Sequence, residues 1–248
     1  MRKKLSNISF TIVVPLYNEV ESLPHTGEVL KTYLHRHEGH VSVLFVDDGS
    51  VDGSDTLLKK LCQNEGMDYI RFETNRGLSS ALKAGFDCVT TPWVGYIDAD
   101  LQTTPEDFDK LLPYTDEYDA VVGYRAHRKD TLSKRLQSRL GNTVRRWMVN
   151  DGIIDTGCPL KLIRTDLARR IPFFDGMHRF IPALIQLEGG RIRQVPVRHF
   201  ERRAGRSKFN LFNRSYQPIL DLFAYRWMKA RYIRYTIIDS SKRYESCR

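Results

Sequence analysis

The sequence predicts an α/β fold in which a mostly parallel sheet is covered by helices. Two observations predict it. Short apolar runs rich in β-branched residues alternate with stretches of helical periodicity between residues 10 and 123, as in βαβ units. Several of these runs end in polar residues, and sheets of this kind bind their ligands at the carboxyl ends of the strands. With 248 residues, the chain is long enough for one large domain or two small ones.

The first apolar runs have the length and composition of strands buried on both faces. The expected strands of this half are Phe10–Pro15, Val41–Val46, Met67–Phe72, Trp93–Ile97 and Tyr118–Gly123. Helices are expected from Ser22, from Ser54 through Leu61, over 78–86, and from Thr104, where Pro105 takes the first helical position. Later elements are a helix over Thr131–Met148, a short strand near Leu160–Ile163, a helix from Thr165 and an apolar/basic alternation over Ile192–Phe200.

The run Val94-Gly-Tyr-Ile-Asp-Ala-Asp-Leu-Gln102 ends abruptly in two acids. In extended backbone alternate side chains point the same way, so Asp98, Asp100 and Gln102 can present oxygen atoms to one point. Such ligands suit Mg²⁺ or Mn²⁺, and Mg²⁺ is usually held by one or two carboxylates together with substrate phosphates. Taken alone, the pattern also fits two solvated loop acids after a buried strand.

Several classes of protein are disfavoured by what the sequence lacks. It has neither a Gly-x-Gly-x-x-Gly after the first strand nor a P-loop, so a nucleotide is expected at carboxylates with a bridging metal. The four cysteines show no metal-site or disulfide-framework spacing, which favours a reducing, cytoplasmic compartment. No run has the length of a signal peptide or a membrane span, so we expect a chain that does not cross a membrane by itself.

Charge is divided unequally along the chain. Residues 1–123 carry a net charge of −9 and residues 124–248 a net charge of +18. A half this basic indicates an anionic partner, which can be phosphate, nucleic acid or a membrane face; a solvated surface without a partner is the alternative. The loop Glu201-Arg-Arg-Ala-Gly-Arg-Ser-Lys208 can close its cations over phosphates, or it can be an ordinary surface loop.

Tyr216–Ile238 is an amphipathic segment. Ile219, Phe223 and Trp227 recur at every fourth residue, and Arg and Lys residues lie among them. The segment is too interrupted to span a bilayer, but it can lie on an anionic membrane face, dock to a membrane subunit or pack against its own domain. We therefore expect a catalytic domain at 1–210, an amphipathic helical segment at 211–240 and a tail at 241–248.

Taken in order, these motifs resemble one known family, the family 2 glycosyltransferases of GT-A (Rossmann-like) fold. Within it they are most similar to the dolichol-phosphate mannosyltransferase and polyprenyl-phosphate glycosyltransferase group. The likeness runs from about residue 10 to residue 208. It rests on Val14-Pro-Leu-Tyr-Asn-Glu19, Val46-Asp-Asp-Gly-Ser50, Asn75-Arg-Gly77, Asp98-Ala-Asp-Leu-Gln102, Gly123-Tyr-Arg125, Asp155-x-Gly157, Arg179-Phe180 and Arg202-x-x-Gly-x-Ser-Lys208.

The resemblance implies a role for each matching position. The nucleotide base is expected on Pro15, Tyr17, Glu19, Asp48 and the backbone of Val46. The ribose and diphosphate are expected along Asp98 and Ala99, and Mg²⁺ or Mn²⁺ on Asp100 and Gln102. The donor diphosphate and acceptor phosphate are expected on Arg125, Arg179, Arg202 and Lys208. Charge stabilisation in catalysis is assigned to Asp100, Arg125, Arg202 and Lys208.

The implied activity is an inverting, metal-dependent transfer of a sugar from a GDP- or UDP-linked donor to a polyprenyl or dolichyl phosphate. It would take place at the cytoplasmic face of a membrane, where the chain meets lipid or a membrane-protein partner. A phosphate acceptor is already anionic, so no general base is obligatory; Asp155 is the leading carboxylate if one acts, although an Asp before Gly also fits a turn. The stretch Asp155–Lys161 lacks the aromatic–Arg pair often seen in the mannosyltransferases, which leaves the sugar and the acceptor contacts open.

Two other functions are kept as alternatives. The first is a family 2 transferase that acts on a sugar hydroxyl of a glycan or glycolipid. The second, more remote, is a nucleic-acid-binding module, which the basic half suggests. That module gives no role to the strand-end carboxylates, so we expect no nucleic-acid partner.

Overall fold

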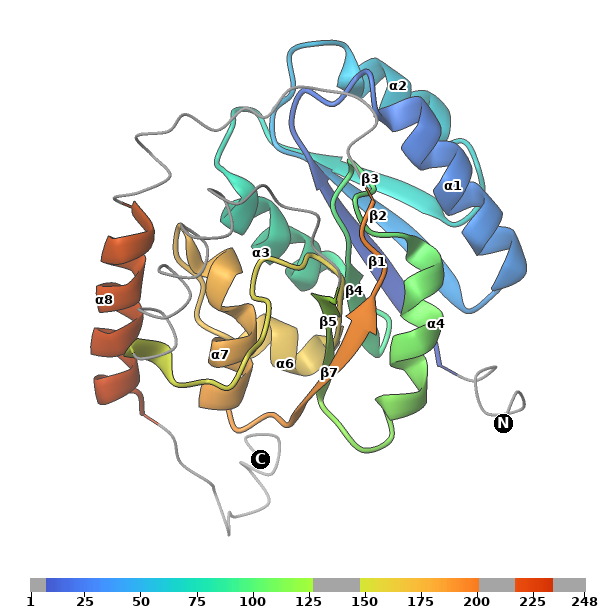
Figure 1. Cartoon of the computed structure of the whole chain (residues 1–248). Coiled ribbons are helices and arrows are strands. Elements are labelled where there is room, and N and C mark those ends of the chain that lie inside the picture. Colours follow the sequence, from blue (N-terminus) through green and yellow to red (C-terminus); the bar gives the residue numbers. More distant parts are fainter. Residues whose placement is uncertain (1–7, 127–147, 201–216, 234–248) are drawn as a thin grey trace, which may run out of the picture.

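The computed structural model describes residues 8–126, 148–200 and 217–233, and within these ranges seven strands form one sheet (Figure 1). The strands lie in the order β3-β2-β1-β4-β6-β5-β7. Their bounds are β1 Phe10–Leu16, β2 Val41–Asp47, β3 Met67–Arg71, β4 Trp93–Tyr96, β5 Ala120–Arg125, β6 Lys161–Arg164 and β7 Ile192–Val197. All seven residues of β1 are buried, as expected for a central strand with helices on both faces.

One strand of the described sheet runs against the others. β6 pairs antiparallel with both β4 and β5, whereas every other described pairing is parallel. The amino end of β6 therefore lies at the same edge as the carboxyl ends of its neighbours. The predicted α/β fold with a mostly parallel sheet is confirmed.

Helices cover the sheet in two layers (Figure 1). One layer packs on the core that contains Phe10, Ile12 and Phe45; it consists of α1 Leu23–Arg36, α2 Ser54–Leu61 and α4 Phe108–Leu111, with the 3₁₀ turns η2 Pro105–Asp107 and η3 Leu112–Tyr114 on either side of α4. The other layer packs on the core that contains Val13 and Val46; it consists of α3 Leu78–Cys88, α6 Thr165–Arg170, η4 Met177–Phe180, α7 Ile181–Leu187 and α8 Gln217–Arg231.

The predicted elements agree with the structure to within a few residues at their ends. The helix expected from Thr104 is a short α4 between two 3₁₀ turns, and the alternation expected up to Phe200 is a strand only as far as Val197. Nearly all of the helix expected over 131–148 and the whole of the loop 201–208 lie outside the described residues. Among the helices that are described, none combines the length and apolarity needed to cross a membrane.

Candidate active site

The loops after β1 and β2 are tied to each other by hydrogen bonds. The backbone N–H of Asn18 donates to Ser50 Oγ at 2.8 Å, and that of Glu19 donates to Ser54 Oγ at 3.0 Å. In the other direction, the backbone N–H of Val51 donates to Asn18 Oδ1 at 2.8 Å. Asn18 has a φ of 51°, a left-handed conformation in which Asn is enriched. The two loops hold together as one unit, and they carry the residues expected to bind the base.

Across this unit, Pro15 of β1 and Val46 of β2 are register partners, so the two apolar positions expected at the base are neighbours in the sheet. The Glu19 carboxylate accepts a hydrogen bond from Ser22 Oγ at 2.7 Å, which fixes it near the start of α1. Tyr17 is half-buried beside them. The structure thus brings together the positions on β1 and β2 that the sequence predicts for the base.

Asp48 connects this unit to a third loop. Its Oδ2 accepts hydrogen bonds from Asn75 Nδ2 at 2.9 Å and from the Gly77 backbone N–H at 2.8 Å, and its Oδ1 accepts one from the Arg76 backbone N–H at 2.6 Å. Burial raises the pKa of Asp48, and the two backbone N–H groups oppose that rise. The carboxylate therefore orders the segment that leads into α3.

The turn that carries Asp48 is itself rigid. Asp47 is fully buried and accepts hydrogen bonds from Arg71 Nε at 3.1 Å and from the Ser50 backbone N–H at 2.9 Å. Gly49 has a φ of 74°, and a Cβ there would lie 2.6 Å from the backbone carbonyl carbon of Thr74, so a larger residue would collide with the neighbouring loop. Asp47 at the end of β2 and Asp48 after it thus both bind protein donors, and they hold the loops of the site in place.

The residues after β4 form a turn. β4 ends at Tyr96, and Leu101 has a φ of 47°. The Leu101 N–H donates to the Asp98 carbonyl at 3.2 Å, and the Gln102 N–H donates to Asp100 Oδ1 at 3.2 Å. Asp98, Asp100 and Gln102 are therefore grouped by this turn and do not follow the alternation of an extended strand. We call residues 98–102 the acidic turn.

Two neighbouring acids give the acidic turn its electrostatic character. Tyr96 Oη donates to Asp98 Oδ1 at 2.7 Å. Burial, and to a lesser degree the nearby Asp100, raise the pKa of Asp98 to about 6, although Tyr96, Lys161 and Arg125 oppose the rise. An acid that resists ionisation beside a second acid marks a place where a cation is favoured.

Lys161 is a member of the site that sequence reasoning missed. It is the first residue of β6 and is 2% exposed. Its ammonium donates to the Cys158 carbonyl and lies 5.2 Å from the centre of the Tyr96 ring. Burial lowers the pKa of Lys161, while Cys158, Asp98 and Asp155 oppose that shift. Lys161 lies at the carboxyl ends of β4 and β5 because β6 runs antiparallel to both strands. The apolar residues near 160–163 do not reveal that direction.

Arg125 and Asp155 form a bidentate ion pair. Arg125 Nε donates to Asp155 Oδ2 at 2.6 Å, and Arg125 Nη2 donates to Asp155 Oδ1 at 2.8 Å. Gly157 leaves room for the pair, since a Cβ there would lie 3.0 Å from Arg125 Nη2. Arg125, which is predicted to bind phosphate, is therefore paired with Asp155, the carboxylate considered as a base. A phosphate that binds Arg125 has to share its guanidinium with Asp155.

Arg179 is likewise engaged by a carboxylate. Its Nη1 donates to Asp221 Oδ2 of α8 at 2.8 Å. The preceding residue, His178, forms a 2.9 Å hydrogen bond between its Nδ1 and Ser79 Oγ at the start of α3. Burial lowers the pKa of His178 to about 3, so this imidazole is neutral at physiological pH. The η4 turn thus connects α3, which begins beside the Asp48 loop, to α8.

The chain beyond β7 returns to the acidic turn. The Phe200 N–H donates to the Gln102 carbonyl at 2.9 Å. Just before it, Arg198 donates through its backbone N–H and its Nε to the buried carboxylate of Asp107, at 2.6 and 2.9 Å. Arg202 and Lys208, which were predicted to bind phosphate, lie outside the described residues.

The donor chemistry of the acidic turn fits a divalent cation. Asp98, Asp100 and Gln102 carry hard oxygen atoms, and a cation would stabilise the charged form of Asp98, whose pKa is raised by burial and by the nearby Asp100. Within residues 8–126, 148–200 and 217–233 there is no group of three or more His, Cys, Asp or Glu residues that could hold a metal. The protein would thus supply one or two carboxylates, and substrate phosphates would complete the shell, as is usual for Mg²⁺.

Comparison with known proteins identifies the family. Residues 11–171 match the family model described as Glycosyl transferase family 2, and this match spans more than half of the chain. The chain belongs to glycosyltransferase family 2. The sheet edge described above, with its acidic turn, is therefore the candidate active site of a family 2 glycosyltransferase.

Individual relatives of this glycosyltransferase agree with that assignment. Dodecaprenyl-phosphate galacturonate synthase of Rhizobium johnstonii is 29% identical over 231 residues, which cover 89% of this chain and 67% of the relative. A mannosyltransferase of Pyrobaculum calidifontis, solved with GDP-Man and Mn²⁺, has a TM-score of 0.62 at 18% identity and covers 94% of this chain and 67% of its own.

A second solved structure has the same fold. Glucosyl-3-phosphoglycerate synthase of Mycobacterium tuberculosis, solved with Mn²⁺, UDP and glucosyl-3-phosphoglycerate, has a TM-score of 0.66 at 14% identity. The match covers 89% of this chain and 80% of that one. These structural likenesses show that the family 2 glycosyltransferase described here has the GT-A fold.

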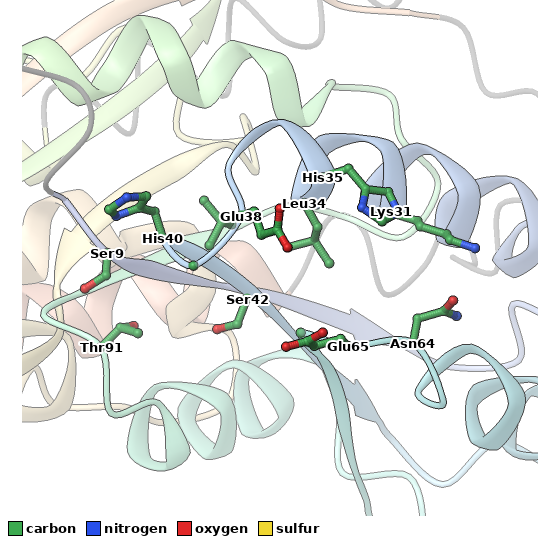
Figure 2. A pocket seen from close by; sticks show the side chains of 13 residues that line it. Ser9, Lys31, Leu34, His35, Glu38, His40, Ser42, Asn64, Glu65 and Thr91 are labelled. Atoms are coloured by element: carbon green, nitrogen blue, oxygen red, sulfur yellow. The ribbon is translucent and has the colours of Figure 1, made fainter. Parts of the chain in front are cut away.

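The glycosyltransferase also has a cavity of about 390 Å³ at the opposite edge of its sheet (Figure 2). Its lining includes Ser9 before β1, Val41 at the start of β2, Gly66 before β3 and Thr91 before β4. These positions mark the amino ends of the parallel strands, away from the acidic turn. The cavity is therefore separate from the candidate active site.

Proposed function

We propose that this family 2 glycosyltransferase transfers a sugar from a GDP- or UDP-linked donor to a polyprenyl phosphate, such as dolichyl phosphate, at the cytoplasmic face of a membrane. The observation that carries the proposal is the acidic turn, in which burial, together with the neighbouring Asp100, raises the pKa of Asp98 to about 6. Such a turn suits a metal-bound diphosphate. The likeness to a dodecaprenyl-phosphate galacturonate synthase supports the lipid phosphate as acceptor.

The donor would lie across the ends of β1, β2 and β4. We assign its base to the joined loops at Tyr17, Glu19 and Asp48, and its ribose and diphosphate to Asp98 and Ala99. The Ala99 carbonyl accepts a 2.6 Å hydrogen bond from Thr26 of α1, which supports this assignment because it fixes the backbone there. Asp100 and Gln102 would hold Mg²⁺ or Mn²⁺ against the diphosphate, and the metal would offset charge on the departing diphosphate when bound.

The reaction we propose is a single displacement with inversion. An oxygen of the acceptor phosphate forms a bond to the anomeric carbon, and the bond from that carbon to the donor diphosphate breaks on the opposite face. The nucleoside diphosphate leaves with the bonding electron pair. Arg125, Arg179, Arg202 and Lys208 are assigned to the phosphate groups of donor and acceptor, where cationic N–H donors would stabilise the developing charge. A phosphate oxygen needs no proton removed, so Asp155 can remain paired with Arg125.

An assay with the purified chain tests the acceptor. Radiolabelled GDP- and UDP-linked hexoses and hexuronates are incubated with Mn²⁺ or Mg²⁺ and a polyprenyl phosphate, and the products are partitioned into chloroform. The proposal expects a chloroform-soluble product that mild acid hydrolyses back to free sugar. Label transferred only to an added glycan or glycolipid would refute the phosphate acceptor and support a sugar hydroxyl in its place.

A further inference from the structure

The helix α8 carries apolar residues on two opposite sides. Leu222 and Tyr225 are 7% and 2% exposed, and they pack into the core beside α7. Phe223 and Trp227 are 60% and 63% exposed, with Ile219 and Leu220 about half exposed. Core packing explains only the first pair. At 3.6 residues per turn, 219, 223 and 227 form one stripe on the side away from the core, and Figure 1 shows α8 at the outer edge of the molecule.

Positive charge borders this exposed stripe. Helical spacing places Arg226 next to Phe223 on one margin of the stripe, and Arg231 next to Trp227 on the other. Both arginines are exposed. The Arg231 guanidinium lies 5.4 Å from the centre of the Trp227 ring. An apolar stripe with cations on both margins is complementary to a bilayer surface, where aromatic and aliphatic groups enter the boundary with the acyl chains and arginines meet anionic headgroups.

Contacts on the inner side fix the orientation of α8. Asp221 pairs with Arg179 at 2.8 Å, and the Tyr225 ring stacks on Phe180 with centroids 5.3 Å apart. Near its end, Lys229 Nζ donates to the Val149 carbonyl at 3.2 Å. The helix is therefore held by the same η4 turn that contacts the start of α3. A surface bound by the outer side of α8 would have a set orientation relative to the sheet edge.

We propose that the outer side of α8, formed by Ile219, Leu220, Phe223 and Trp227 with Arg226 and Arg231 at its margins, binds the surface of an anionic lipid bilayer. The inference deepens the proposed function and rests on it for the choice of occupant, because an acceptor with a polyprenyl chain is embedded in a bilayer. Because Phe, Trp and Arg are also enriched at protein interfaces, the choice of a bilayer rests on the proposed acceptor and on the charge of the margins, and the experiments below test it against a second copy of the chain.

Vesicle flotation of the purified chain tests the proposal. The vesicles contain phosphatidylcholine alone or phosphatidylcholine mixed with phosphatidylglycerol, without polyprenyl phosphate and without donor. We expect the chain to float with the anionic vesicles, Phe223→Ser/Trp227→Ser to weaken binding at least tenfold, and Arg226→Glu/Arg231→Glu to weaken it by at least about fivefold for each cation removed. Circular dichroism should show that both variants keep the fold, because the altered side chains are exposed.

Matched controls lie on the other side of the molecule. Tyr69→Ser removes an exposed aromatic ring from β3, and Lys59→Glu/Lys60→Glu reverses two exposed charges on α2; both should bind vesicles like the unaltered chain. Loss of binding in the controls equal to that in the α8 variants would overturn the proposal. So would an unaltered chain that stays unbound but forms a dimer which Phe223→Ser/Trp227→Ser dissociates, because the stripe would then serve a second copy.

A separate measurement distinguishes this proposal from the proposed function. Transfer to a short, water-soluble prenyl phosphate needs no bilayer, so the α8 variants should retain it. Vesicle binding without any transfer would uphold the role of α8 and refute the activity. Transfer without vesicle binding would uphold the activity and refute the role of α8.

Discussion

Asp48 after β2 and Asp98 after β4 stand on either side of β1, and the fold surrounds them differently. Asp48 accepts three hydrogen bonds from the loop 75–77, two of them from backbone N–H groups. Among the described residues, the Asp98 carboxylate accepts one, from Tyr96, and it has Asp100 as a neighbour. The Asp48 carboxylate has its hydrogen-bond partners within the protein, and it holds the loop 75–77 in place. The Asp98 carboxylate is disfavoured in its charged form by burial and by Asp100, and a bound cation would stabilise that form.

The largest effect is expected at the acidic turn. Asp100→Ala should lower metal-dependent sugar transfer by about 10²- to 10³-fold, because it removes a charge-bearing group from the site where the diphosphate leaves. The fold should remain intact, as Asp100 is only partly buried. Steady-state assays with saturating Mn²⁺ measure this, with Glu117→Ala, an exposed acid before β5, as the control. Undiminished turnover would remove Asp100 from the metal assignment.

The next prediction uses the pKa of Asp98 in the metal-free chain. Its folded pKa of about 6 exceeds the ordinary 3.8, so the folded state binds this proton more tightly than the unfolded state. The stability from this group is fully present below about pH 3.8 and is lost as the pH rises through 6, a loss of about 3 kcal/mol at about 1.4 kcal/mol per pKa unit. Asp98→Asn, which does not titrate, should lack this loss.

Urea unfolding in EDTA between about pH 3.5 and about pH 7, a range that spans both pKa values, measures this loss. If the unfolding free energies of the unaltered chain and of Asp98→Asn depended equally on pH, the pKa of Asp98 would not be raised in the folded state.

The contrasting variant is Asp48→Ala. Removing this carboxylate leaves the backbone N–H groups of Arg76 and Gly77 without their acceptor, and we expect unfolding free energy to fall by about 2–3 kcal/mol. Asp68→Ala, on the exposed side of β3, should change it by less than about 0.5 kcal/mol. Urea unfolding at neutral pH compares the three proteins. If Asp48→Ala were as stable as Asp68→Ala, the hydrogen bonds of Asp48 to the loop 75–77 would not stabilise the fold.

A smaller effect is expected where the loops after β1 and β2 meet. Ser54→Ala removes the acceptor of the Glu19 N–H and a donor to Asp52 Oδ1, which should cost about 1 kcal/mol of stability and raise the KM for the donor more than it lowers kcat. Thr32→Ala, an exposed hydroxyl on α1, is the matched control. An unchanged KM would mean that the joined loops do not position the base.

The same comparison explains what sequence alone could reveal. The apolar runs before Asp47 and Asp98 are local signals, and the rule that ligands bind at the carboxyl ends of parallel strands placed both acids at one edge. Lys161 was missed because its position depends on the antiparallel direction of β6. The pairing of Arg125 with Asp155 and of Arg179 with Asp221 spans 30 and 42 residues, and no local pattern indicates that a cation predicted for phosphate has a carboxylate partner.

The central claim is that the acidic turn holds a divalent cation together with the donor diphosphate. Electron paramagnetic resonance of free Mn²⁺, titrated with the metal-free chain in the presence and absence of UDP or GDP, tests it most directly. The account predicts that the chain removes Mn²⁺ from solution beyond what the nucleotide alone binds, that it does so strongly only when nucleotide is present, and that Asp100→Ala abolishes this binding. Equal Mn²⁺ binding with and without nucleotide, or full binding by Asp100→Ala, would contradict it.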